Sequence, residues 1–309
     1  MAEKLNICLD IGGTFIKGMV FDELRTEKIE GISYYPSKSD ESKNKIIENF
    51  YLIIKDLLSQ IPDEYILSSI TMAFPGPFDY ERGICLIQGL NKYNSLYKVN
   101  VGSEIKERLN QDSKFKDSDI PIHFYNDAVA FAYEEFCSNQ PKNYKGAYFT
   151  LGTGCGSTFI DRGEFVKNEY GIPESGMIYN ERFNNSVIDD YISARGLEDI
   201  ISEKYGYRVN IEKIASKAET GNKDATDIFF QFGENIGLAL RPFLENFSPS
   251  AVIFGGQISK SFKFMEEGFN KGVGDLKIDH IGVSKDTSYS TIRGLMRLSK
   301  KQVINSSEV

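Results

Sequence analysis

Near its start the chain reads Asp10-Ile11-Gly12-Gly13-Thr14-Phe15-Ile16-Lys17, a glycine pair between two short apolar runs. The runs at 5–10 and 16–22 predict two strands joined by a tight turn. A glycine pair in this setting is most often a simple hairpin turn. The same stretch also suits phosphate binding, because bare backbone amides can approach an anion beside a hydroxyl and an ammonium group. Neither the Walker pattern nor the dinucleotide pattern G-x-G-x-x-G occurs here.

A second stretch repeats this arrangement about 140 residues later. Gly152-Thr153-Gly154-Cys155-Gly156 lies between predicted strands at 146–151 and 157–161. A third glycine pair, Gly255-Gly256, follows a predicted strand at 251–254, and α/β sheets usually place ligands at such strand ends. We expect this third pair to offer bare backbone to an adenosine. Two units of strand, glycine loop and strand indicate an internally duplicated α/β architecture.

Hydrophobic periodicity supplies the other elements. Apolar residues at helical spacing predict helices at 42–60, 128–136, 225–247 and 291–301, the third kinked near Pro242. Short apolar runs predict strands at 68–74 and 120–125, the first ending at the turn Pro75-Gly76-Pro77. At roughly 150 residues per domain, the length of the chain predicts two domains.

The composition excludes several classes of protein. The chain has 36 Lys and Arg against 44 Asp and Glu, a formal charge of −8, which argues against nucleic-acid binding. With 41% hydrophobic and 26% charged residues it resembles ordinary globular proteins. No apolar run approaches the roughly 20 residues that span a membrane, and the opening residues lack the apolar region of a signal peptide. We therefore expect a cytoplasmic protein that does not bind membranes.

Cysteine and histidine are too sparse for most metal or nucleophile chemistry. The four cysteines are widely separated, and no C-x-x-C pair occurs; they are Cys8, Cys85, Cys137 and Cys155. Only His123 and His280 are available beside them. These counts predict free thiols without a structural zinc site, and they argue against a serine or cysteine hydrolase triad. Carboxylates must then carry any acid–base chemistry.

A series of short motifs spans nearly the whole chain. They are DIGGTFIK at 10–17, PGPFD at 75–79, GLN at 89–91, NDA at 126–128, LGTGCG at 151–156, SARGL at 193–197 and FGGQIS at 254–259. In this order the chain resembles the ROK family (repressors, open reading frames, kinases) of the actin-like ATPase superfamily. The resemblance implies a two-lobed, ribonuclease H-like α/β fold with duplicated domains. Residues 1–118 with a final helix at about 291–303 would form the smaller lobe and 119–290 the larger, in a homodimer.

The resemblance also implies a nucleotide site that uses ATP and Mg²⁺. Asp127 would be the catalytic base, and Asp10 would organise Mg²⁺ directly or through water. Backbone amides would cradle the phosphates, at Gly12, Gly13, Thr14, Gly152, Thr153 and Gly154, and an adenosine would lie on Gly255 and Gly256. Lys17 is either a supporting charge or an exposed strand residue. On local sequence Asp127 is equally a helix N-cap before Ala128, and it could do both.

On the sugar side the resemblance implies binding by Asn91, Asn126, Asp127 and Glu174. Local alternatives are a turn residue for Asn91 and a surface charge for Glu174. Many family members carry Glu-x-Gly-His, whose histidine binds sugar and zinc, followed by a cysteine-rich loop. This chain has Glu174-Ser175-Gly176-Met177 and lacks that loop. We therefore expect no zinc, and a pocket that accepts a β-glucoside or an N-acetylhexosamine as an alternative to glucose.

These expectations combine into an ATP-dependent kinase that phosphorylates a hexose or hexose derivative, at the 6-hydroxyl by family analogy. One alternative is a ROK transcriptional regulator. Such repressors carry a helix-turn-helix domain ahead of the first glycine loop, whereas here the first strand starts by Leu5. Another is a non-catalytic sugar-sensing protein, which Met177 permits and which Asp10 and Asp127 disfavour.

Overall fold

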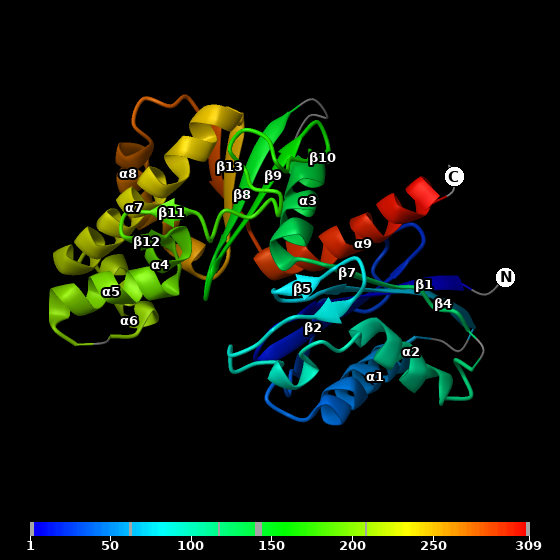
Figure 1. Cartoon of the computed structure of the whole chain (residues 1–309). Helices are drawn as coiled ribbons and strands as arrows, with labels where there is room; N and C mark the ends of the chain where they lie inside the picture. Colours follow the sequence, from blue (N-terminus) through cyan, green and yellow to red (C-terminus); the bar gives the residue numbers. More distant parts are fainter. Residues whose placement is uncertain (1–2, 62–63, 117, 140–143, 208, 307–309) are drawn as a thin grey trace. The chain divides into compact units, whose positions relative to one another are not determined.

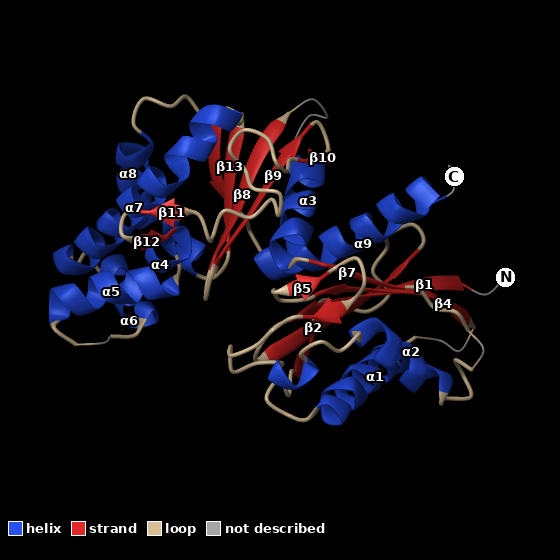
Figure 2. Ribbon diagram, viewed as in Figure 1, coloured by secondary structure: helices blue, strands red, loops and turns tan. Residues whose placement is uncertain are grey.

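The computed structural model describes residues 3–61, 64–116, 118–139, 144–207 and 209–306 (Figure 1). The chain forms two compact units, the first from Met1–Glu134 with Ser288–Val309 and the second from Glu135–Thr287. Each unit contains a five-stranded sheet with helices packed on it (Figure 2). The chain thus passes from the first unit to the second after Glu134. The lobe boundary expected near residue 118 by family analogy stays a prediction.

The sheet of the first unit has the strand order β3-β2-β1-β4-β7. Its strands are β1 (Glu3–Ile11), β2 (Phe15–Asp22), β3 (Ser33–Pro36), β4 (Tyr65–Ala73) and β7 (Ile122–Tyr125). β1, β2 and β3 are antiparallel, whereas β4 runs parallel to both β1 and β7. Four of these strands were predicted with ends shifted by up to three residues, and β3 was not predicted. The central strand β1 is almost fully buried, as its continuous apolar run requires.

The sheet of the second unit repeats this topology in the order β10-β9-β8-β13-β14. Its strands are β10 (Glu164–Phe165), β9 (Cys155–Asp161), β8 (Lys145–Leu151), β13 (Ala251–Gly255) and β14 (His280–Val283). Again the first three are antiparallel and the last two continue in parallel. The predicted duplication is therefore confirmed in strand order and direction. In each sheet the central hairpin carries one of the predicted glycine loops at its tip.

Helices cover both faces of the first sheet. In Figure 1, α1 (Lys43–Ser59) and α2 (Val101–Asn110) lie on one side of it, and α9 (Thr287–Ser306) lies on the other with α3 (Asp127–Asn139). Between β4 and α2 the chain forms the short β5 (Phe78–Asp79), β6 (Ile84–Cys85) and η1 (Asn94–Leu96). Helices α3 and α9 cross in contact: a Cβ on Gly294 would lie 1.8 Å from the Ala130 carbonyl oxygen. Only glycine fits at that crossing.

The second unit is rich in helices that the sequence analysis did not assign. They are α4 (Ile188–Ile192), α5 (Ala194–Tyr205), α6 (Ile211–Glu219) and α8 (Phe262–Val273), with η2 (Ile258–Ser261) and the hairpin β11 (Arg182–Phe183) and β12 (Ser186–Val187). The predicted long helix is α7 (Lys223–Phe247), which continues past Pro242. α7 packs closely on α8, since a Cβ on Gly233 would lie 2.1 Å from the Met265 carbonyl oxygen. Among the described helices none is long and apolar enough to cross a membrane.

Candidate functional site

Acidic residues gather at one edge of the first sheet. Asp10 of β1 pairs in register with Ala73 of β4, and Ala73 pairs with Tyr125 of β7. Asn126 and Asp127 follow directly after β7. Because parallel strands end at the same edge, this topology brings Asp10 and Asp127 together at the carboxyl ends of the strands. Residues 117 positions apart in the chain thus become neighbours.

Helix α3 begins at this edge, and Asn126 is the residue that caps it. The Asn126 carbonyl accepts from the Ala130 N–H at 3.0 Å, and its side-chain oxygen accepts from the Ala128 N–H at 2.9 Å. Asp127 is the first helical residue, and its carboxylate lies 3.0 Å from the same Ala128 nitrogen. The interpretation of Asp127 as the N-cap is therefore wrong, because its neighbour takes that place. The side chain of Asp127 remains exposed at the protein surface.

The surroundings of Asp127 raise the pKa of its carboxyl group. Displacement of water by the surrounding protein is the main cause, and the negative charge of Asp10 adds to it. The Ala128 N–H and the positive charge of Lys92 act in the opposite direction. A carboxylate with raised proton affinity and an exposed side chain is suited to general-base chemistry.

The first glycine loop is held by side-chain hydroxyl groups that donate to its carbonyls. Ser39 donates to the Gly13 oxygen at 2.7 Å, Ser37 donates to the same oxygen, and Tyr93 donates to the Gly12 oxygen at 2.8 Å. In a planar trans peptide the N–H points opposite to the C=O. The N–H groups of Gly13 and Thr14 therefore point away from these hydroxyls, and neither has a hydrogen-bond partner in the described part of the chain. Such amides can bind anionic oxygens. The Gly12 N–H instead donates to the Phe15 carbonyl at 3.0 Å, so the expectation that this amide faces a phosphate is wrong.

Lys17 forms an ion pair across the hairpin. Its ammonium donates to the Asp10 carboxylate at 2.9 Å, and the two residues are direct partners in the β1–β2 register. Both side chains are partly buried. The alternative interpretation of Lys17 as an exposed strand residue is thus wrong. Its positive charge is neutralised by Asp10.

The same edge offers oxygen donors of the kind that Mg²⁺ prefers. No three His, Cys, Asp or Glu side chains of the described residues gather as a ready-made metal site. Mg²⁺ commonly binds one or two carboxylates and completes its shell with water and substrate phosphates. Asp10, beside a second carboxylate and next to free loop amides, fits that donor set.

Asn126 is held in one orientation by a tyrosine that the sequence analysis missed. Its side-chain N–H donates to the Tyr80 hydroxyl at 3.1 Å, and Tyr80 donates to the Phe74 carbonyl at 3.0 Å. The only signal for Tyr80 was its place directly after the PGPFD motif. Asn91 has a left-handed backbone with φ of 53° and an exposed side chain, as its interpretation as a turn residue requires. A turn position leaves that side chain available for a ligand.

The second glycine loop is clamped between two parts of the α4–α5 segment. The Gly152 carbonyl accepts from the Ala194 N–H at 2.8 Å, and the Cys155 N–H donates to the Asp189 carboxylate at 2.7 Å. Arg195 pairs with Asp189 and with Asp190. Thr153 and Gly154 stay exposed at the tip. The sequence analysis did not find Asp189, although the SARGL motif marked the helix that follows it.

The third glycine pair lies beside this loop. Gly255 pairs in register with Thr150, so the end of β13 adjoins the end of β8. Gly256 has φ of 89°, and a Cβ there would lie 2.2 Å from the Leu151 carbonyl oxygen. Its N–H donates to the Thr287 hydroxyl at 2.8 Å. Gly255 is buried and Gly256 is half-buried, and the contact of this pair with an adenosine stays a prediction.

The predicted sugar-binding segment of the second unit is a turn attached to β9. The Gly176 N–H donates to the Pro173 carbonyl at 2.8 Å, and the Ile178 N–H donates to the Ser157 hydroxyl at 3.0 Å. Glu174 is exposed and Met177 is half-buried. The exposure of Glu174 agrees with surface charge and with a ligand contact alike.

The predicted residues therefore form two groups, one in each unit. The first unit holds Asp10, Gly12, Gly13, Thr14, Lys17, Asn91, Asn126 and Asp127. The second unit gathers Gly152, Thr153, Gly154, Gly255 and Gly256 at one edge of its sheet and carries Glu174 on the separate turn that precedes β11.

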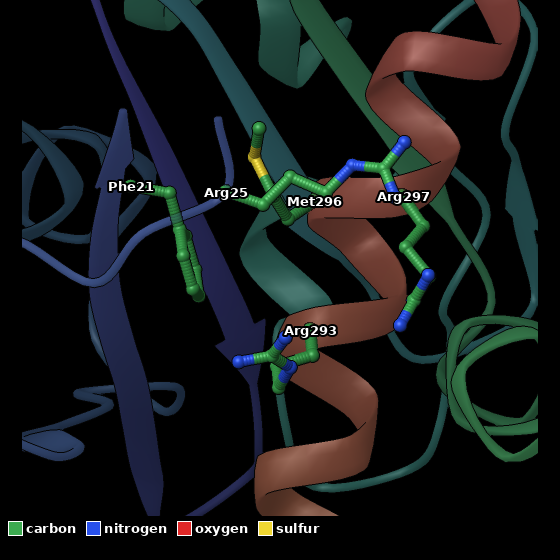
Figure 3. Close-up of a pocket in the computed structure, with 5 residues that line it drawn as sticks. All are labelled: Phe21, Arg25, Arg293, Met296 and Arg297. Carbon is green, nitrogen blue, oxygen red and sulfur yellow. The ribbon is translucent and has the colours of Figure 1, made fainter. Parts of the chain in front are cut away.

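A shallow pocket of the first unit lies away from these residues, at the other end of β2. Figure 3 shows Arg293, Met296 and Arg297 of α9 together with Phe21 and Arg25. Arg293 and Arg297 both pair with the buried Glu134 of α3. This ion-pair network joins α9 to α3 and contains none of the predicted site residues.

The comparisons with known proteins agree with this fold. A family model described as "ROK family" matches residues 6–281. The chain belongs to the ROK family. An N-acetyl-D-glucosamine kinase of Haemophilus influenzae is 22% identical over 286 residues, which is 86% of this chain and 88% of that protein. The xylose repressor of Bacillus subtilis is 22% identical over 299 residues, 93% of this chain and 73% of the repressor.

Among solved structures, a ROK family glucokinase from Streptomyces griseus in complex with glucose and AMPPNP superposes with a TM-score of 0.71. It is 19% identical, and the match covers 95% of this chain and 98% of that one. The similarity establishes that this ROK protein has the two-lobed, actin-like α/β fold that the resemblance implied.

Proposed function

We propose that this ROK protein is an ATP-dependent sugar kinase, which transfers the γ-phosphoryl group to a hydroxyl of a hexose or hexose derivative. One observation carries the proposal: the exposed carboxyl of Asp127, with its raised pKa, lies at the same sheet edge as Asp10 and the free amides of the first glycine loop. A base beside an anion site is what phosphoryl transfer to an alcohol requires. The kinase and the glucokinase to which the chain is similar support it.

In the proposed reaction Asp127 takes the proton of the attacking sugar hydroxyl. The hydroxyl oxygen forms a bond to the γ-phosphorus, the bond from that phosphorus to the bridging oxygen breaks, and ADP leaves. The N–H groups of Gly13 and Thr14 bind phosphate oxygens, and by family analogy the N–H groups of Thr153 and Gly154 have the same role. The Gly152 N–H already donates to the Gly154 carbonyl at 3.1 Å, so the expected contact of this amide with phosphate is withdrawn. Asn126, held by Tyr80, orients the sugar beside the base. By family analogy the acceptor is the 6-hydroxyl.

Asp10 would hold Mg²⁺, directly or through water, and its pairing with Lys17 fixes the carboxylate in place. When bound, the metal ion neutralises charge on the phosphate oxygens. Gly255 and Gly256 would contact the adenosine. Lys17 would support the phosphate site only through its ion pair with Asp10.

The sugar is proposed to be a substituted hexose. Asn91, Asn126, Asp127 and Glu174 would bind hydroxyls, since paired hydrogen bonds to fixed polar groups discriminate between polyols. Met177 is an adaptable apolar side chain and accommodates a β-glucoside or an N-acetyl group. The N-acetyl-D-glucosamine kinase relative supports the second substrate. A kinase assay over a panel of sugars tests this, and a preference for free glucose would contradict it.

A sugar-sensing regulatory protein without turnover is the second candidate, favoured by the similarity to the xylose repressor. The two candidates differ in one observable. A kinase consumes ATP in proportion to sugar phosphate formed, whereas a sensor binds sugar without forming product.

Replacing the proposed base separates the candidates further. Asp127→Asn should abolish turnover while the affinity for sugar, measured by calorimetry, stays near that of the wild type. Asp119→Asn is a matched control, because Asp119 is an exposed carboxylate of the same unit that pairs with Lys106. Turnover that survives the Asp127→Asn change would refute the role of Asp127.

A further inference from the structure

Lys92 lies on the first glycine loop. It follows the GLN motif of residues 89–91, which the sequence analysis singled out without this lysine. The Lys92 Cδ atom is 3.2 Å from the position that a Cβ on Gly13 would occupy, and its Cβ is 4.0 Å from that position. The aliphatic stem of Lys92 thus packs on the loop at Gly13, and a larger residue at position 13 would collide with the stem.

Its neighbour Tyr93 fixes the segment to the loop. The buried Tyr93 donates its hydroxyl to the Gly12 carbonyl at 2.8 Å, and its backbone N–H donates to the Ser39 carbonyl at 2.6 Å. Ser39 in turn donates to the Gly13 carbonyl at 2.7 Å. Because this network ties Tyr93 to both loop glycines, the stem of Lys92 keeps its place on the loop.

The charge of Lys92 differs in its surroundings from that of Lys17. Lys17 is paired with Asp10 at 2.9 Å, whereas Lys92 takes part in none of the ion pairs formed by the described residues. Lys92 is half-buried, and its charge reaches Asp127, where it lowers the pKa of the carboxyl group. The sheet edge therefore contains one lysine that neutralises a carboxylate and one whose ammonium is available to a ligand.

We propose that Lys92 is a catalytic residue, whose ammonium binds an oxygen of the transferred γ-phosphoryl group beside the Gly13 and Thr14 amides. This inference rests on the proposed kinase function. In phosphoryl transfer the negative charge spreads over the equatorial oxygens of the moving group, and positioned cations stabilise it. The stem of Lys92 lies against the loop, and its charge is within electrostatic reach of Asp127. A purely structural role would need only the apolar stem.

The experiment removes the charge and keeps the stem. Lys92→Met should lower kcat about 100-fold, the scale of losing one preorganised donor to a developing charge, with the KM for sugar within about twofold of wild type. The acidic limb of the kcat/KM profile should move to higher pH, because Asp127 loses a neighbouring positive charge. Lys92→Arg should recover part of kcat.

Nucleotide binding gives a readout that does not depend on turnover. Lys92→Met should weaken binding of a nonhydrolysable ATP analogue about tenfold and leave ADP binding unchanged, since only the first carries a γ-phosphoryl group. Lys98→Met is the control, because Lys98 lies on the same segment with its ammonium 5.2 Å from the centre of the Tyr97 ring. It should behave as wild type.

The outcomes distinguish this inference from the proposed function. If the wild type phosphorylates a sugar and Lys92→Met retains its kcat, its pH profile and its affinity for the analogue, the role of Lys92 is refuted while the kinase stands. If the wild type forms no sugar phosphate from any sugar tested, the proposed function falls, and the inference falls with it.

Discussion

The glycine loops at 12–14 and 152–154 occupy equivalent places in two sheets of the same strand order, yet they are held by different groups. In the first loop, hydroxyls of Ser37, Ser39 and Tyr93 donate to carbonyls. In the second, a backbone N–H donates to the Gly152 carbonyl, and the Asp189 carboxylate accepts from the Cys155 N–H. Both arrangements leave amides at the loop tip unengaged within the described part of the chain. The duplicated topology thus places two loops at equivalent positions, and unrelated groups hold them there.

The two hairpins differ more sharply in charge. Asp10 and Lys17 face each other one step before the closing pair Ile11 and Ile16 of the first hairpin. The corresponding pair of the second hairpin is Thr150 and Gly156. Only the first sheet edge therefore carries the ion pair and the adjoining Asp127. On the proposed function, the duplicated scaffold would supply two anion-binding loops, and the first copy would carry the acid–base and metal-binding groups.

The largest expected effect is a difference in folding stability between alanine variants of Gly12 and Gly152, the first glycines of the two loops. A Cβ on Gly12 would lie 2.6 Å from the Phe15 carbonyl oxygen, whereas a Cβ on Gly152 would meet no heavy atom within 4 Å. Gly12→Ala should lower the free energy of unfolding by about 2 kcal/mol, because backbone must shift. Gly152→Ala should change it by less than about 0.5 kcal/mol. Urea unfolding of both variants measures this, and equal losses would contradict the structural difference.

The second prediction concerns the clamp on the second loop. Asp189→Ala removes the acceptor of the Cys155 N–H and should cost about 1–2 kcal/mol of stability. If this loop binds phosphates as proposed, the affinity for a nonhydrolysable nucleotide should fall about tenfold. Asp190→Ala is the matched control, since Asp190 pairs with the same Arg195 and does not touch the loop. Equal nucleotide affinities in the two variants would show that the clamp does not shape the site.

The third prediction compares the buried hydroxyl groups of Tyr93 and Ser193. Tyr93→Phe removes the donor to the Gly12 carbonyl and should cost about 1 kcal/mol. The Ser193 hydroxyl, next to the second loop, is buried and has no hydrogen-bond partner among the residues that the structure describes. Ser193→Ala should therefore leave stability unchanged or raise it by up to about 1 kcal/mol. Chemical unfolding gives both values, and a loss for Ser193→Ala as large as that for Tyr93→Phe would count against this assignment.

The smallest expected effect concerns the pH dependence of stability, to which the carboxyl groups of Asp127 and Asp112 should contribute with opposite signs. Folding raises the pKa of Asp127, so the stability that it contributes is present below the unfolded-state pKa and disappears as pH rises through the folded-state pKa. Asp127→Asn should thus have a higher Tm than wild type at pH 7 and a similar Tm near pH 3. This would be a stability gain at the expense of function.

Asp112 provides the control. Hydrogen bonds from Tyr51 and from the Lys114 N–H, with help from Lys55, lower the pKa of Asp112 to about 2. Its contribution is present above the unfolded-state pKa and is lost as pH falls toward 2. Asp112→Asn should have a lower Tm than wild type at pH 7. Thermal scans between pH 3 and pH 8 would contradict the assignment if both variants shifted in the same direction.

Much of this structure could be predicted from local patterns. Hydrophobic patterns located α1, α3, α7 and α9 and seven strands of the two sheets, because the spacing of apolar residues reflects burial directly. Helix α2, the short α4 and the helices α5, α6 and α8 were not assigned. The close contact between α7 and α8 depends on paired glycines, as at Gly233, whose role is visible only when both helices are in place.

The sequence by itself determined the family, the duplicated hairpins and the positions of the glycines in the loops. These features depend on residue type and on neighbours in the chain. Tertiary structure alone decided that Lys17 pairs with Asp10 and that Lys92 lies against Gly13. Those facts depend on strand register and on long-range packing. Hydrogen bonds and charge effects act between groups that are close in space, whatever their distance along the chain.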